Sequence, residues 1–211
     1  MTAWLLVVVS YLLGAIPTGY LAGRLTRGID IREHGSGNPG ATNTFRVLGP
    51  RIAAPVMLLD LLKGFIPTAL FVQWDGRDLW SWALVYGAAA IIGHVFPIYL
   101  RFKGGKGVAT ATGVFLALAP VAVGITLVVW LITLRLSRMV SLASIMGALT
   151  LLVALAFLEQ RPAVLGLGIA VACFVIFAHR SNIGRIMRGE EYRFGVKNVG
   201  DPQPVRREDP R

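Results

Sequence analysis

The chain has 211 residues, of which 55% are apolar and only 15% are charged, and its mean hydropathy is +0.65. Soluble domains carry roughly 25% charged residues, so this composition argues against a soluble protein. The single cysteine, Cys173, excludes an intrachain disulfide, and the three widely spaced histidines offer no metal-ligand spacing. We therefore expect an all-α fold, a polytopic bundle of membrane helices, with no metal or cofactor.

Six apolar stretches follow one another along the chain, separated by short basic clusters. The first, residues 3–23, would be about 31 Å long as a helix, which matches a hydrocarbon core of roughly 30 Å. The first positive charge, Arg24, comes only after this stretch, so the basic start of a cleaved signal peptide is missing and we expect the stretch to remain as a membrane helix. The other stretches are residues 52–72, 79–99, 108–134, 140–158 and 163–178.

The stretch 108–134 is long for one span and short for two, and Pro120 lies near its middle. If it forms a hairpin of two helices of about 13 residues, nearly all basic residues fall on one side of the membrane, and only Arg77 and Arg161 fall on the other. If it forms one span, the basic residues divide almost evenly. The positive-inside bias therefore predicts the hairpin, and with it seven transmembrane segments, an outside N-terminus and a cytoplasmic C-terminus. The transmembrane domain would cover residues 1–195, followed by a disordered, solvated or headgroup-facing cytoplasmic tail, residues 196–211, with no nucleic-acid partner.

Three polar segments interrupt the apolar pattern, and this topology puts all three at the cytoplasmic face. The first runs Gly35-Ser-Gly-Asn-Pro-Gly-Ala-Thr-Asn43 and is followed by Arg46. Its glycines permit positive φ angles, so successive backbone N–H groups can point into one concavity that suits an anion. An ordinary glycine-rich turn between helices is an equally open alternative.

The second segment runs Phe102-Lys-Gly-Gly-Lys-Gly107 into the start of a helix. The two lysines supply positive charge, and the helix N-terminus directs unpaired N–H groups at a ligand. The spacing is not that of a Walker A motif, so nucleotide binding does not follow. The alternative is a basic loop that holds lipid headgroups.

The third segment, residues 179–185, brings His179 and Asn182 onto one face if the helix continues. A histidine that caps a helix end for structural reasons is the alternative. Inside the apolar spans, we expect Asp60 and Lys63 to pair and neutralise one another, and His94 to be a packed or hydrogen-bonding residue rather than a base.

On these residues the chain resembles the acyl-phosphate-dependent glycerol-3-phosphate acyltransferases of bacterial membranes, the PlsY family. The resemblance covers about residues 5–195 and includes the three polar segments, the stretch Gly93-His-Val-Phe-Pro-Ile-Tyr99, and the supporting stretches Leu59-Asp-Leu-Leu-Lys-Gly64 and Val140-Ser-Leu-Ala-Ser144. It implies transfer of a fatty acyl group from acyl phosphate to the 1-hydroxyl of glycerol 3-phosphate, at the cytoplasmic side of the inner membrane. The His-x4-Asp motif of acyltransferases that use acyl carrier protein or coenzyme A is missing.

The resemblance also suggests roles for individual residues. Ser36, His179 and Asn182 would orient the attacking hydroxyl or stabilise the oxyanion. The proton acceptor would be either His179 or a substrate phosphate oxygen, and we favour the phosphate. Ser144 is a weaker candidate for the same face. The residues expected to bind substrate and its phosphates are Gly35, Gly37, Asn38, Thr42, Asn43, Arg46, Lys103, Gly104, Gly105, Lys106, Gly107 and Ser141.

The expected partners are the two substrates, membrane lipids and an enzyme that produces acyl phosphate. A rival hypothesis from another class is a transporter or flippase for an organic phosphate or an anionic lipid. Such carriers often show internal repeats and midplane sites on broken helices, whereas the polar segments here lie at one face.

Overall fold

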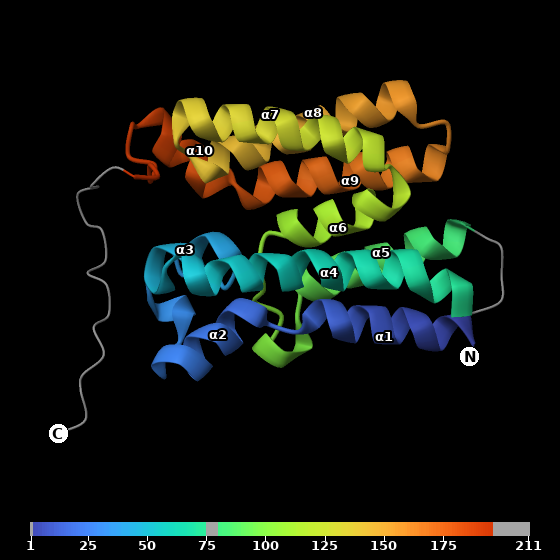
Figure 1. Ribbon diagram of the computed structural model, residues 1–211, viewed down its shortest axis with the longest axis horizontal. Coiled ribbons are helices and arrows are strands. Elements are labelled where there is room, and N and C mark those ends of the chain that lie inside the picture. Colours follow the sequence, from blue (N-terminus) through green and yellow to red (C-terminus); the bar gives the residue numbers. More distant parts are fainter. Residues whose placement is uncertain (1, 75–79, 196–211) are drawn as a thin grey trace.

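The structure, a computed structural model, describes residues 2–74 and 80–195, and all regular secondary structure in these two ranges is helical (Figure 1). The predicted tail, residues 196–211, and Arg77 lie outside the described residues. In chain order the elements are α1 (Ala3–Ala15), α2 (Thr18–Arg27), the 3-10 helix η1 (Ile31–Glu33), α3 (Ala41–Leu48), α4 (Pro50–Trp74), α5 (Trp80–Val95), the 3-10 helix η2 (Ile98–Leu100), α6 (Val108–Leu118), α7 (Pro120–Ser137), α8 (Val140–Leu158), α9 (Pro162–Ala178) and α10 (Arg180–Met187).

The long helices form two groups, with α6 between them (Figure 1). One group packs α1 and α4 against α5, and the other packs α7 and α9 against α8. The short helix α6 belongs to the core, because Val114 and Phe115 are fully buried together with Leu155 of α8 and Val164 of α9.

Glycines let α4 and α6 approach closely. A Cβ added at Gly64 of α4 would lie 2.1 Å from the carbonyl oxygen of Thr110, and one added at Gly113 of α6 would lie 2.0 Å from that of Leu61. Small residues at such crossings are typical of membrane helix packing, where close van der Waals contact replaces the hydrophobic effect as the driving force.

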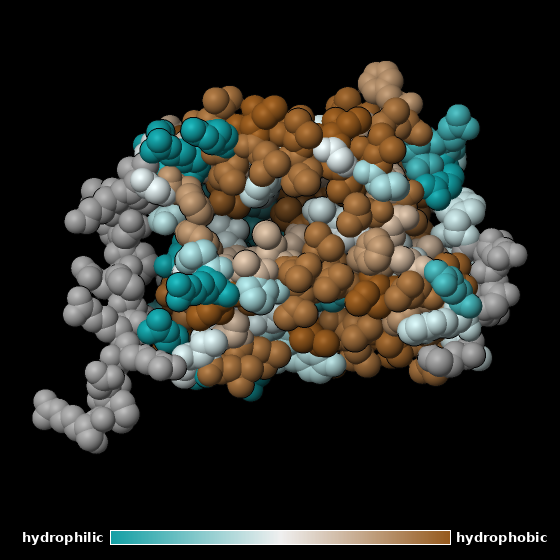
Figure 2. Space-filling view, viewed as in Figure 1, coloured by the Kyte–Doolittle hydropathy of each residue, from teal (hydrophilic) through white to brown (hydrophobic). Residues whose placement is uncertain are grey.

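The outer surface is suited to lipid. Within the two described ranges, four helices are long and apolar enough to cross a membrane, two bent helix pairs pass the same test together, and α6 is a shorter apolar helix. On the face seen in Figure 2, apolar residues cover the middle of the molecule, and polar residues gather toward its two ends. On α7 only Ala122 and Val123 are buried, so most of this apolar helix faces outward. The described residues thus confirm the expected all-α fold and provide several helices suited to cross a membrane.

The first apolar stretch, expected as one helix over residues 3–23, is instead two helices. α1 ends at Ala15, α2 begins at Thr18, and their axes are bent by 42°. The break contains Pro17, which cannot donate a backbone hydrogen bond. The carbonyl of Ile16 is satisfied from another helix, because it accepts a hydrogen bond of 3.0 Å from Nζ of Lys63.

The stretch 108–134 forms two helices that run in opposite directions, as the hairpin hypothesis required (Figure 1). Their lengths of 11 and 18 residues differ from the expected two of about 13, because α7 continues through Ser137. Pro120 starts α7, where a missing N–H costs nothing. Arg161 caps the end of α6 by donating to the carbonyl of Leu118 at 2.6 Å.

Candidate functional site

Four side chains from three helices, α3, α8 and α10, surround one carboxylate, that of Glu191. Its side chain is only 1% exposed. Oε1 accepts hydrogen bonds from Ser141 Oγ at 2.8 Å and from Asn182 Nδ2 at 2.7 Å, and Oε2 accepts one from Arg185 Nε at 2.8 Å. A guanidinium nitrogen of Arg46 lies 3.9 Å from Oε1. This cluster already holds one anion, so its side chains are chemically suited to bind anionic groups.

Lys106 joins the second polar segment to the third. Its Nζ donates a hydrogen bond to Oδ1 of Asn182, so Asn182 contacts the lysine through its oxygen and Glu191 through its nitrogen. Arg46 also stacks on Tyr192, with its guanidinium 4.5 Å from the ring centroid. A cationic group from α3, one from the loop before α6 and the amide of α10 are therefore brought together.

The loop that carries Lys106 turns back onto the end of α5. The N–H groups of Gly104 and Gly105 donate to the carbonyls of Val95 and His94, both at 3.1 Å. Gly107 has φ +77°, which favours glycine, and it caps the N-terminus of α6. Lys106 thus directly precedes the residue that caps the helix, close to the unpaired N–H groups of the first turn, as the sequence predicted.

The first polar segment forms a compact loop organised by Asn43. Its amide nitrogen donates to the carbonyls of Ile31 and His34, both at 3.0 Å, and its oxygen accepts from the N–H of Ser36 at 2.8 Å. Gly35 and Gly37 have φ values of +59° and +72°, the positive angles expected for an anion-binding loop. The Ser36 and Thr42 side chains lie at the surface of this loop.

His179 lies between α9 and α10, whose axes are bent by 53°. The helix therefore does not continue straight through His179, but His179 and Asn182 are both 4% exposed. His179 Nδ1 lies 2.8 Å from the carbonyl oxygen of Val175. Because a carbonyl can only accept, Nδ1 carries the proton in the neutral ring and Nε2 is the acceptor nitrogen.

Burial disfavours charge on both titratable side chains that flank Asn182. Burial lowers the pKa of the His179 imidazole to about 4, and the nearby Lys106 ammonium acts in the same direction. Burial also lowers the pKa of Lys106 to about 8, although the attraction of Glu191 opposes this shift. At neutral pH the imidazole is therefore neutral and the lysine is mostly charged.

The predicted site residues thus fall into two sets. Arg46, Lys106, Ser141 and Asn182 meet around or beside Glu191, and His179 is buried three residues before Asn182. The other set forms the two glycine-rich loops and comprises Gly35, Ser36, Gly37, Asn38, Thr42, Asn43, Lys103, Gly104, Gly105 and Gly107. Sequence reasoning missed Glu191 and Arg185, and the only clue was that Glu191 is one of few carboxylates near the three segments.

The predicted pair inside the bundle is also present. Lys63 Nζ lies 2.8 Å from Asp60 Oδ1, and His94 is buried against the same carboxylate with its Nδ1 at 3.6 Å. None of these three residues contacts Glu191 through a hydrogen bond or ion pair in the described part of the chain.

The sequence has clear relatives. The family model for glycerol-3-phosphate acyltransferase matches residues 4–189. A glycerol-3-phosphate acyltransferase of Desulforamulus reducens is 42% identical over 198 residues, which cover 94% of this chain and 98% of the relative. One from Listeria monocytogenes is 48% identical over 189 residues, covering 89% and 94%.

Two solved structures are similar in fold as well as in sequence. Both are crystal structures of PlsY (YgiH), described as an integral membrane glycerol 3-phosphate acyltransferase. The glycerol 3-phosphate form has a TM-score of 0.85 and 42% identity, and the match covers 92% of this chain and 96% of that one. The lysophosphatidic acid form has a TM-score of 0.82 and 41% identity, covering 92% and 95%.

Proposed function

This chain belongs to the family of integral membrane glycerol-3-phosphate acyltransferases of the PlsY type, and on that premise we propose that its acyl donor is an acyl phosphate. The acceptor would be the 1-hydroxyl of glycerol 3-phosphate, and the products lysophosphatidate and inorganic phosphate. The observation that carries this proposal is the cluster around Glu191, where cationic and amide groups from remote segments converge. Both substrates carry phosphate, so a site rich in anion-binding groups fits their chemistry.

In the proposed reaction, the hydroxyl oxygen attacks the carbonyl carbon of the acyl phosphate, and the bond from that carbon to the phosphate oxygen then breaks. Phosphate leaves with the bonding electron pair. Because this leaving group is a weak base, no strong general acid is needed. Hydrogen-bond donors placed at the oxyanion stabilise the tetrahedral intermediate, and removal of one such donor costs roughly 10²- to 10³-fold in rate.

The residues are assigned as follows. Ser36, His179 and Asn182 orient the hydroxyl or stabilise the oxyanion, while Arg46, Lys106 and the two glycine-rich loops hold the phosphates. Asn43 contributes by shaping the first loop, because its amide is already bonded to three backbone groups. Ser141 contributes to substrate binding as a member of the cluster around Glu191, to which its hydroxyl donates a hydrogen bond.

The hydroxyl proton passes to a phosphate oxygen of the substrate rather than to His179. The low pKa of this imidazole, about 4, makes it a weak base. A phosphate monoester has its second pKa near 6, so it is the stronger base of the two and is already present in the substrate.

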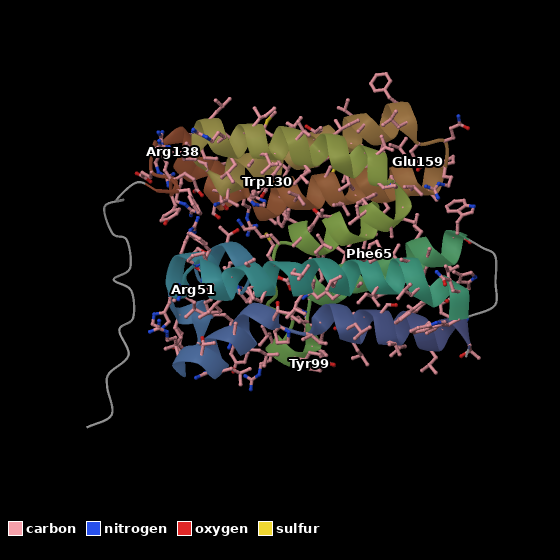
Figure 3. All side chains as sticks on the ribbon, viewed as in Figure 1. Arg51, Phe65, Tyr99, Trp130, Arg138 and Glu159 are labelled. Atoms are coloured by element: carbon pink, nitrogen blue, oxygen red, sulfur yellow. The ribbon has the colours of Figure 1, made fainter. Side chains whose placement is uncertain are left out.

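We further propose that residues 1–195 form one transmembrane acyltransferase domain with seven crossings in the inner membrane. The N-terminus would be outside, and the C-terminus and the active site would face the cytoplasm. Two basic residues support this orientation, since Arg51 and Arg138 lie at the same end of the molecule, opposite the end at which Glu159 lies (Figure 3). An enzyme that produces acyl phosphate must supply the donor.

Product analysis with purified protein in detergent tests the proposal. Acyl phosphate and glycerol 3-phosphate should give lysophosphatidate and phosphate in equal amounts. Matched reactions contain acyl coenzyme A or acyl carrier protein in place of acyl phosphate, and they should give no product. Turnover with a thioester but not with acyl phosphate would contradict the assigned donor. A carrier would give no covalent product in detergent.

A further inference from the structure

Three charged or ionisable side chains are buried inside the bundle and take no part in the chemistry proposed above. Asp60 and Lys63 lie on successive turns of α4, and His94 lies in the last turn of α5. Their side chains are 2%, 8% and 8% exposed. Ionisable groups are costly at membrane depth, so a cluster of them calls for a physical role.

Asp60 connects three elements of the bundle. Its Oδ1 accepts a hydrogen bond from Thr18 of α2 at 2.6 Å, forms an ion pair with Nζ of Lys63 at 2.8 Å and lies 3.6 Å from Nδ1 of His94. Lys63 also donates to the carbonyl of Ile16 at the break between α1 and α2. The carboxylate is therefore neutralised by Lys63 and lies beside the imidazole.

The opposite side of the imidazole supports the loop that carries Lys106. A Cβ added at Gly105 would lie 2.2 Å from Nε2 of His94, and the three atoms closest to it are all imidazole atoms. The carbonyl of His94 also accepts the N–H of Gly105 at 3.1 Å. Gly105, which precedes Lys106, thus contacts His94 twice: its N–H bonds to the His94 carbonyl, and its Cα packs against the imidazole.

α4 holds the other end of the same loop. The residue after Lys63 is Gly64, whose Cα packs against the carbonyl of Thr110 in the first turn of α6. The segment between His94 and Thr110 is therefore fixed at both ends by the residues that form or adjoin the buried charged cluster.

We propose that Asp60 and His94 are positioning residues for the phosphate-binding loop, an inference that rests on the function proposed above. Asp60 orients the imidazole of His94, and the imidazole sets the position of Gly105. This contact determines where Lys106 and the N–H groups at the start of α6 lie relative to the substrate phosphate. Lys63 balances the charge of Asp60.

A complementation experiment tests the contact between His94 and the loop. His94→Ala leaves a gap beside Gly105, and Gly105→Ala places a methyl group where the imidazole is. In the double variant the methyl group occupies the space left by the imidazole. Gly166→Ala is the matched control, because nothing lies within 4 Å of a Cβ at Gly166.

KM is first measured for each substrate with the Lys106→Gln variant, and the substrate whose KM rises is the one that Lys106 binds. For that substrate, His94→Ala and Gly105→Ala should each raise KM by about 10-fold or more with kcat within about threefold. Binding geometry is lost in these variants while the reacting groups remain. The double variant should return KM to within about threefold of wild type, a non-additive result expected of residues in contact. Gly166→Ala should match wild type.

Asp60 is tested together with its neutralising lysine. Asp60→Asn/Lys63→Met removes the carboxylate without leaving an unpaired buried ammonium, and it should raise the same KM as His94→Ala does. If Asp60 and His94 served only to stabilise the fold, these variants would have lower thermal stability and an unchanged KM. That outcome would overturn the inference. If His94→Ala does not fold, the comparison of Gly105→Ala with the double variant decides, since only a contact of this kind lets a second substitution restore KM.

Equilibrium binding of glycerol 3-phosphate, measured by calorimetry on the same variants, separates this inference from the proposed function. If wild-type protein forms no lysophosphatidate, the proposed function fails, whereas the binding comparison still tests the loop. Weaker binding in both single variants with recovery in the double variant supports the inference. Equal affinity in wild type and His94→Ala contradicts it.

Discussion

Oε1 of Glu191 accepts a hydrogen bond of 2.7 Å from Nδ2 of Asn182, a residue predicted to act in catalysis. The same carboxylate group is surrounded by Arg46 and Arg185, and Lys106 contacts the other side of the Asn182 amide. A buried anion at this position offsets the mutual repulsion of three cationic groups. It also fixes the amide so that its oxygen faces Lys106.

Glu191→Gln should therefore unfold more easily than wild type, by about 3 kcal/mol, because breaking a buried ion pair leaves charges uncompensated. Glu190→Gln is the matched control. Glu190 is 56% exposed and pairs with Arg188, which is 60% exposed, so its loss should cost no more than about 1 kcal/mol. Thermal unfolding in detergent measures both. Equal melting temperatures for the two variants would show that the carboxylate does not organise the cluster.

The sequence identified the polar segments because each combines glycine with cationic or amide residues between apolar spans. It also identified the hairpin at Pro120 through the distribution of arginines. It did not show which proline breaks a helix. Pro55 and Pro67 lie inside the continuous helix α4, whereas the chain breaks at Pro17, where Lys63 of α4 donates a hydrogen bond to the carbonyl of Ile16.

Glu191 could not be assigned from the sequence for a similar reason. It follows a short polar helix and has no neighbour in the chain that marks it as part of a site. Its partners Ser141 and Arg46 are 50 and more residues away, and only the tertiary fold brings the segment after α10 to Ser141 of α8 and Arg46 of α3. Local patterns predict which groups are available, while long-range packing decides which of them meet.

The pKa of Lys106, lowered to about 8 by burial, predicts an alkaline limit to substrate binding. Below pH 8 the ammonium is charged and attracts phosphate, and above pH 8 it becomes neutral, so kcat/KM should fall with rising pH from about 8. Bound phosphate favours the charged lysine, so the limit in kcat should lie at higher pH. Lys106→Arg should lose the limit in kcat/KM, because arginine stays charged throughout this range. An unchanged limit in Lys106→Arg would assign it to another group.

The role of His179 can be tested from the pH dependence of activity at acidic pH. If a phosphate oxygen accepts the proton, activity should fall below about pH 6 in both wild type and His179→Gln, since the second pKa of a phosphate monoester is near 6. The turnover number of the variant should fall by about 10²-fold or less, as expected for one lost hydrogen-bonding group at the reacting centre. A limit near pH 4 in wild type that disappears in His179→Gln would instead identify the imidazole as the base. Single-turnover rates across pH make the comparison.

Because α4 and α6 cross in close contact, we expect one added methyl group at the crossing to lower the stability of the fold. Gly64→Ala would place a Cβ 2.1 Å from the carbonyl oxygen of Thr110, so the helices must separate. We expect a loss of about 1 to 3 kcal/mol, typical of overpacking in a close-packed core. Gly124→Ala on α7 is the matched control, since nothing lies within 4 Å of its added Cβ. Thermal unfolding of the two variants should differ, and equal stability would show that the two backbones are not in contact.

The orientation of the chain can be tested by cysteine labelling. Cys173 is the only cysteine in the sequence and is exposed on α9, so the experiment starts from Cys173→Ala. Single cysteines then replace Ser36, Lys103, Arg188 and, at the opposite end of the bundle, Gln160. In intact cells a membrane-impermeant thiol reagent should label only Gln160→Cys, and after permeabilisation it should label all four. Because the proposed site needs the three polar segments on one side, labelling of any of the first three positions from outside would contradict both the topology and the assembly of the site at the cytoplasmic face.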